Sequence, residues 1–185
     1  MAEQNRPRVT RLRFVVSLFL AVMILSGSAY FFGVRGLRFF LVPSTSMEPT
    51  LRPSDYLITM KENTYRRGDI CVIKDPKESG SYVVKRIVGL PGDTIAIAGG
   101  ALFLNGKYAS EPYIKEPMEA ALSPVTVPEG QYFVLGDNRN DSEDSLSWRR
   151  GIPHEDIVGK VRWIYSPLSR FGPVQSYPLT NTDGV

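Results

Sequence analysis

The feature that most constrains this fold is an apolar run near the N-terminus, covering residues 14–32. Arginines precede the run at positions 6, 8, 11 and 13, and only small or weakly polar residues interrupt it. A helix of roughly 20 apolar residues is long enough to cross a bilayer. We therefore expect one transmembrane helix over 14–32 and a cytoplasmic segment over 1–13, because arginines favour the cytoplasmic side of a span.

This topology places the rest of the chain outside a plasma membrane, with the lipid bilayer as one partner. The alternative is a cleavable signal peptide, because Ser26, Ser28 and Ala29 could form a processing site after a shorter apolar core. Arg35 and Arg38 beyond the run reduce the charge asymmetry on which the topology depends.

The composition excludes several classes of protein. A chain of 185 residues is long enough for one globular domain and an anchor. Its net charge is only +3 and the charges are interleaved, so we expect no nucleic acid partner. The single cysteine, Cys71, lies in an apolar run typical of a core. With one histidine, His154, and no Cys/His cluster, no metal or other cofactor is expected.

Short apolar runs separated by turn residues predict a mainly β domain over 33–165 and an irregular tail over 166–185. The clearest local signals are the Gly-Gly pair at 99–100 and the Asn-Gly pair at 105–106, which readily form tight turns. They predict a three-stranded meander over 94–108. Further strands are expected at 56–60, 70–74, 82–90, 125–127, 132–135 and 158–165. The proline-bearing stretch 112–128 should be irregular, with one short helical turn around 116–122.

The strand at 82–90 carries two adjacent basic residues, Lys85 and Arg86, which alternate between its two faces among apolar neighbours. An arginine stays protonated, whereas desolvation can lower the pKa of a lysine by several units. Only Lys85 can therefore become a base. The alternative is an ordinary lysine whose charged end reaches water.

Ser46 precedes Met47-Glu48-Pro49, and taken alone it is an ordinary turn residue. A serine hydroxyl needs a base to attack a carbonyl, and a neutral lysine can serve. About 14 residues separate Ser46 from the span, so the chain cannot carry it far from the membrane. The apolar stretch 39–42 could contact lipid, or it could pack in the core.

A third polar segment, Gly-Asp-Asn-Arg-Asn-Asp-Ser-Glu-Asp-Ser at 136–145, follows an apolar run. With the segments around Ser46 and Lys85 and the apolar run, it makes the chain resemble the bacterial type I signal peptidases as far as about Arg162. The resemblance implies a membrane-anchored serine endopeptidase that removes signal peptides from exported preproteins. It also implies a mainly antiparallel β catalytic domain of signal-peptidase or LexA-like type.

The resemblance assigns roles position by position. It implies that Ser46 is the nucleophile and Lys85 the general base, with Ser142 orienting the lysine amine through a hydrogen bond. The oxyanion hole would consist of the Ser44 side chain and the backbone N–H of Ser46. Three further residues would brace the site: Asp137, Arg139 and Asp144. It also implies cleavage after small residues at the first and third positions before the cut, and we expect a monomer.

One departure from the family's pattern concerns Leu146, where the family commonly has an arginine. The usual ion pair of Asp144 is therefore in doubt, with Arg149 or Arg150 as substitutes. Two competing interpretations stay open. A LexA-like, self-cleaving regulator should carry a DNA-binding segment where this chain has its apolar run. A catalytically silent, membrane-tethered scaffold would keep the fold without the activity.

Overall fold

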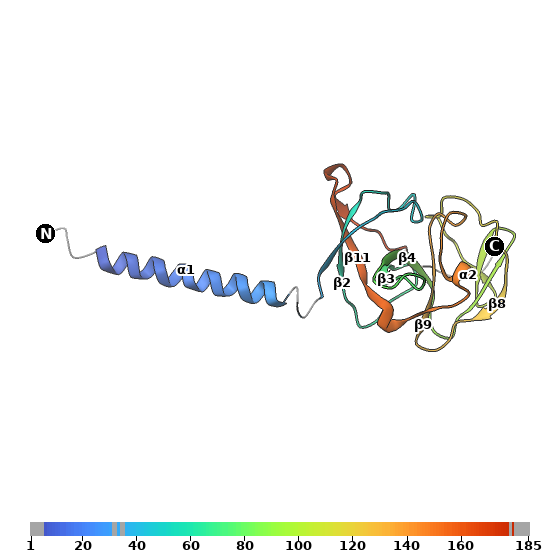
Figure 1. Cartoon of the computed structure of the whole chain (residues 1–185), viewed down its shortest axis with the longest axis horizontal. Helices are drawn as coiled ribbons and strands as arrows, with labels where there is room; N and C mark the ends of the chain where they lie inside the picture. The colour runs from blue at the N-terminus through green and yellow to red at the C-terminus, as the bar shows by residue number, and fades with distance from the viewer. Residues whose placement is uncertain (1–5, 31–32, 34–35, 178, 180–185) are drawn as a thin grey trace. The chain divides into compact units, whose positions relative to one another are not determined.

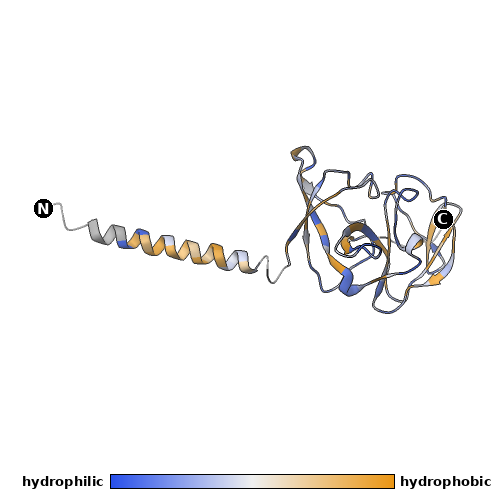
Figure 2. Cartoon of the chain, in the orientation of Figure 1, coloured by the Kyte–Doolittle hydropathy of each residue, from blue (hydrophilic) through white to orange (hydrophobic). Residues whose placement is uncertain are grey.

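The computed structural model describes residues 6–30, 33, 36–177 and 179. The chain divides into two compact units, residues 1–37 and residues 38–185. The first contains α1 (Arg6–Ala29), which Figure 2 shows as a largely apolar helix. Its segment Arg11–Ala29 has a mean hydropathy of 2.0 and is long and apolar enough to cross a bilayer. Most of the predicted span lies in α1, while residues 31 and 32 lie outside the described residues.

The second unit contains two antiparallel sheets, which confirms the predicted mainly β fold (Figure 1). The larger sheet has the order β1-β2-β11-β3-β4-β9-β10, with β12 beside β11, and the smaller has the order β7-β6-β5-β8. The larger sheet consists of β1 (Arg38–Leu41), β2 (Tyr56–Met60), β3 (Ile70–Lys74), β4 (Tyr82–Gly89), β9 (Gln131–Leu135), β10 (Ile152–Pro153), β11 (Ile157–Ser166) and β12 (Gly172–Pro173). The smaller consists of β5 (Thr94–Ala98), β6 (Ala101–Leu104), β7 (Lys107–Tyr108) and β8 (Leu122–Thr126). The short helices are α2 (Ser145–Trp148), η2 (His154–Asp156) and η3 (Leu168–Arg170).

The predicted meander is confirmed in β5, β6 and β7, whose strands pair in register. Its two turns depend on residues that tolerate positive φ. The φ angles are 56° and 81° at Gly99 and Gly100, and 52° and 77° at Asn105 and Gly106. The local sequence is therefore sufficient to explain this part of the fold.

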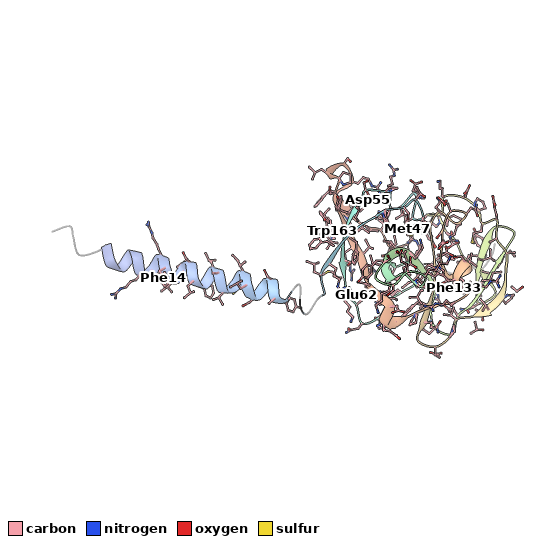
Figure 3. All side chains as sticks on the ribbon, viewed as in Figure 1. Phe14, Met47, Asp55, Glu62, Phe133 and Trp163 are labelled. Carbon is pink, nitrogen blue, oxygen red and sulfur yellow. The ribbon has the colours of Figure 1, made fainter. Side chains whose placement is uncertain are left out.

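Three buried clusters stabilise the two sheets, and β4 contributes to each of them. Val83 and Ile87 pack in the cluster that contains Cys71, whereas Val84 packs in the cluster around Met47. This alternation confirms the period-2 prediction for β4, and the complete burial of Cys71 confirms its core role. Met47 and Phe133, which belong to different clusters, are labelled in Figure 3.

Several sequence predictions need correction. Residues 38–41, where no strand is expected from the sequence, form β1 and pair with β2. No helical turn forms over 116–121, where the described chain has bends and coil. The strand expected at 125–127 is β8, which begins earlier, at Leu122.

The tail from residue 166 onward contains more order than its sequence indicates. It carries η3 and β12, and β12 pairs with β11. Arg170 Nε and Nη2 donate to the Asp55 carboxylate at 2.8 and 2.9 Å, and Leu179 is buried in a core cluster. These long-range contacts hold the tail on the domain, and no local pattern could reveal them.

Candidate active site

The structure brings Ser46 and Lys85 together, although they are far apart in the sequence. Ser46 lies in the turn after β1, and Lys85 lies in β4 opposite Cys71 of β3. Lys85 Nζ is 2.7 Å from Ser46 Oγ. Only 8% of Ser46 and 3% of Lys85 is exposed, so the contact is sheltered from water.

The environment of Lys85 favours its neutral form. Burial lowers the pKa of the amine from 10.5 to about 8, because the charged ammonium loses its hydration. The carboxylates of Asp144 and Asp75 oppose this shift, since a nearby negative charge favours the ammonium. Burial outweighs them, so a substantial fraction of Lys85 is neutral at mildly alkaline pH.

The loop 136–142 after β9 contacts the backbone around Ser46 directly. Asn138 N donates to Ser46 O at 3.1 Å, and Asn138 Nδ2 donates to Thr45 O at 3.3 Å. The Thr45 hydroxyl in turn donates to Asp141 at 2.7 Å. A Cβ on Gly136 would lie 2.5 Å from Ser46 O, so only glycine allows this approach. The loop therefore determines where the Ser46 peptide lies.

The two other serines predicted for the site lie in different surroundings. Ser44 is exposed, and its Oγ lies 3.3 Å from Ser46 Oγ. Ser142 Oγ is buried next to Gly136 and forms no hydrogen bond of good geometry among the described residues, although it lies near enough to the Asp144 carboxylate to lower the pKa of that group. The hydrogen bond expected between Ser142 and Lys85 is therefore not formed in this structure.

Asp144 acts as a helix cap rather than as an ion-pair partner. Its carboxylate accepts from Leu146 N at 3.1 Å and from Gly136 N at 3.0 Å, which ties α2 to the loop 136–142. Burial raises the pKa of Asp144, while these hydrogen bonds, the nearby Ser142 hydroxyl and the charge of Lys85 oppose that shift. Within the described part of the chain Asp144 forms no ion pair, and Arg149 and Arg150 are exposed. The substitution of Arg149 or Arg150 for the missing arginine is therefore not observed.

Asp137 forms a fully buried, bidentate ion pair with Arg86 of β4, with N–O distances of 2.7 and 2.8 Å. The Thr50 hydroxyl donates to the same carboxylate at 2.6 Å. The Arg86 guanidinium also donates to Gly68 O at 2.8 Å and lies 3.8 Å from the centroid of the Tyr113 ring. This cluster joins the Ser46 turn, β4 and the loop 136–142.

Arg139 joins the same loop to the segment before β8. Its guanidinium forms a bidentate pair with Glu111 at 2.5 and 2.7 Å, and its Nε donates to Gly136 O at 2.9 Å. The Tyr113 hydroxyl donates to Glu111 at 2.6 Å. Sequence reasoning missed Glu111 and the pairing role of Arg86. The signal available for Arg86 was its charge inside an apolar strand, which requires a buried carboxylate.

A buried lysine beside a serine hydroxyl, on an antiparallel β domain, is the arrangement of a serine–lysine hydrolase. In the described residues no group of three or more His, Cys, Asp or Glu side chains is placed to hold a metal ion. The family described as signal peptidase, peptidase S26, matches residues 11–166. The chain belongs to this family and is a peptidase.

The relatives confirm the resemblance to the type I signal peptidases. Signal peptidase I of Bacillus licheniformis is 39% identical over 144 residues, which cover 70% of this chain and 77% of that protein. Probable signal peptidase I-2 of Synechocystis sp. is 37% identical over 180 residues, covering 92% of this chain and 80% of that protein. A solved signal peptidase I from Enterococcus faecalis V583 is 34% identical, with a TM-score of 0.43, and covers 53% of this chain and 97% of that one. None of these comparisons favours the self-cleaving regulator or the silent scaffold.

Proposed function

We propose that this protein removes signal peptides from exported preproteins, with Ser46 as the nucleophile and Lys85 as the general base. The observation that carries the proposal is the buried contact of 2.7 Å between Lys85 Nζ and Ser46 Oγ. Because burial lowers the pKa of Lys85 to about 8, its lone pair is available at moderate pH. The family match and the named relatives supply the substrate class.

The reaction follows from this pair. Neutral Lys85 accepts the Ser46 proton as Oγ attacks the scissile carbonyl, which gives a tetrahedral oxyanion. When the C–N bond breaks, Lys85 returns the proton to the leaving amine. Lys85 then takes a proton from water as the water oxygen attacks the acyl carbon. The bond between that carbon and Ser46 Oγ breaks, and Lys85 returns the proton to Oγ, which restores both residues.

Ser44 Oγ and the backbone N–H of Ser46 are the proposed oxyanion donors. The support for Ser44 is its position, since its hydroxyl lies 3.3 Å from Ser46 Oγ and thus beside any carbonyl that Ser46 attacks. A donor fixed at that place is worth a few kcal/mol in the transition state, about 2.7 to 4.

Ser142, Asp137, Arg139 and Asp144 are proposed as positioning residues. Asp137 and Arg139 hold the loop 136–142 through buried bidentate pairs, and Asp144 ties that loop to α2. Ser142 is proposed to orient the Lys85 amine once acylation has removed the Ser46 hydroxyl as its partner. The support is a buried Ser142 hydroxyl that lies beside the Asp144 carboxylate and forms no hydrogen bond of good geometry among the described residues.

We also propose that α1 is retained as an anchor in the plasma membrane, with the N-terminus in the cytoplasm and the β domain outside. The apolar helix and the arginines that precede its apolar part support this topology. A monomer is sufficient for the proposed chemistry, because both members of the pair come from one chain.

A cleavage assay tests the proposal. The full-length protein is reconstituted in liposomes with a purified preprotein, and the products are identified by mass spectrometry. We expect one cut, after small residues at the first and third positions before it, and no product with the Ser46→Ala variant. Equal cleavage by that variant, or an intact preprotein with the wild type, would refute the proposed function.

A further inference from the structure

A second cleft lies outside the serine–lysine site. It has a volume of about 710 Å³ and lies between β8, β9 and α2, whose positions are shown in Figure 1. Neither Ser46 nor Lys85 lines it. Its walls are mainly apolar and include Leu122, Val125, Val127, Phe133 and Leu146, and we call it the β8–α2 groove. Its size and lining match those of ligand sites, which usually measure about 300–1,000 Å³.

The groove is lined by two arginines, of which Arg150 also lines a neighbouring cleft with Asp75 and Asp156. Arg149 and Arg150 line it and are exposed, and neither forms an ion pair within the described residues. No aspartate or glutamate is among its described lining residues. Two arginine side chains that line one apolar cleft favour an occupant with carboxylate groups.

The backbone at Arg149 is a second unusual feature. This residue ends α2 in the left-handed conformation, with φ 54° and ψ 34°. Glycine adopts that conformation without strain and is the usual residue at such a helix end, whereas an arginine there costs free energy. An arginine kept in a strained position is consistent with a use for its side chain at this place.

The edge of the smaller sheet favours a peptide over a lipid as the occupant. β8 is the last strand of its sheet, so its outer edge is paired with no other described strand, and residues 123–126 are exposed. An extended peptide can hydrogen-bond to such an edge, which an acyl chain cannot do. Pro124 lacks an N–H, so a complete ladder cannot form and the side chains must supply much of the affinity.

We propose that the β8–α2 groove binds an extended peptide that presents apolar and then acidic side chains on one face, at every second position, and that this peptide is a segment of the preprotein. The apolar side chains fill the cleft, and the acidic ones pair with Arg149 and Arg150. The assignment to the preprotein rests on the proposed function, whereas the binding chemistry does not. The groove would then add a specificity determinant beyond the residues around the cut.

The first test measures binding directly. The probe is a short fluorescent peptide with leucines and then aspartates at every second position and serines between them, and its Kd for the full-length Ser46→Ala protein in nanodiscs is measured by anisotropy. Arg149→Gly with Arg150→Gln removes both charges and relieves the backbone at 149. We expect Kd to rise about three- to tenfold, which corresponds to about 0.65–1.4 kcal/mol for the two exposed ion pairs together. Arg149→Lys with Arg150→Lys should keep Kd within about twofold of the parent protein, because an exposed ion pair depends mainly on the charge, which remains.

The matched control is Lys61→Gln with Arg66→Gln, which removes two exposed charges outside the groove. For this control variant we expect Kd to stay within about twofold of the parent protein. A peptide with asparagine in place of aspartate should bind the parent protein more weakly. Equal Kd values for all variants, or an equal loss in the control, would overturn the proposal. The proposal is also wrong if Arg149→Gly with Arg150→Gln weakens binding to phosphatidylglycerol vesicles but leaves binding of the peptide unchanged.

The second test concerns the preprotein. Two precursors differ only in a segment after the cut, with aspartates in one and asparagines in the other. We expect KM to be about three- to tenfold lower for the aspartate precursor with unchanged kcat, and equal KM values with Arg149→Gly and Arg150→Gln. If the wild-type protein has the same KM for both precursors, the occupant of the groove is not the preprotein. If the wild-type protein cuts neither precursor, the proposed function is wrong. The binding proposal is then still decided by the Kd of the fluorescent peptide for the Ser46→Ala protein.

Discussion

Gly136→Ala should disable the active site through a steric effect alone. A methyl group at this position would lie 2.3 Å from Ser142 Oγ and 2.5 Å from Ser46 O, while ordinary contacts begin near 3.4 Å. The Ser46 peptide would have to move by about 0.9 Å, the difference between 3.4 and 2.5 Å. Asn138 N holds that oxygen at 3.1 Å, so the turn cannot move freely. Misplacement of a reacting group by about 1 Å can cost about 100-fold in rate.

We therefore expect kcat/KM of Gly136→Ala for a signal-peptide substrate to fall about 100-fold. Overpacking should lower the free energy of unfolding by about 1–3 kcal/mol, which thermal denaturation can measure. Gly172→Ala is the matched control, because a Cβ there meets nothing within 4 Å. Wild-type kcat/KM in Gly136→Ala would refute the argument that the close approach of the loop positions Ser46.

Other substitutions test the remaining parts of the site. Ser46→Ala and Lys85→Met should each abolish cleavage of a preprotein, while circular dichroism shows an intact fold. The double variant should lose no more activity than either single variant, because the pair acts as a unit. Ser142→Ala should lose less activity than either. Asp137→Asn should lower the free energy of unfolding by about 3–5 kcal/mol in thermal denaturation, because it leaves Arg86 buried without its counter-charge. A loss below about 1 kcal/mol would contradict the stabilising role of this ion pair. Protease added outside spheroplasts should digest the β domain, whereas full protection, or a mature N-terminus near residue 30, would refute the proposed topology.

The local signals in the sequence predicted much of the β domain. The turns at 99–100 and 105–106, and the alternation along β4, are properties of neighbouring residues, so they can be read without knowing the fold. β1 was missed because Phe39 and Leu41 are apolar yet about half exposed, which hides the usual alternation. α2 has only four residues, too few for a helical period to show.

The site was predicted only in part, because its chemistry depends on distant contacts. The sequence indicated that Lys85, rather than Arg86, could be a base, and the family resemblance suggested its partner Ser46. It did not indicate that Arg86 pairs with Asp137, 51 positions away, or that Glu111 holds Arg139 from an irregular segment. Periodicity describes which face a residue occupies, but it does not show what lies across from that face.

The pH dependence of kcat/KM tests the central claim, that a neutral Lys85 activates Ser46, most directly. Below its pKa Lys85 is an ammonium ion without a lone pair, so it cannot accept the Ser46 proton. Burial lowers that pKa to about 8, so activity should rise with pH and reach half of its plateau near pH 8. An acidic limb near 10.5, the ordinary value of a lysine, or activity that does not depend on pH through this range, would contradict the account.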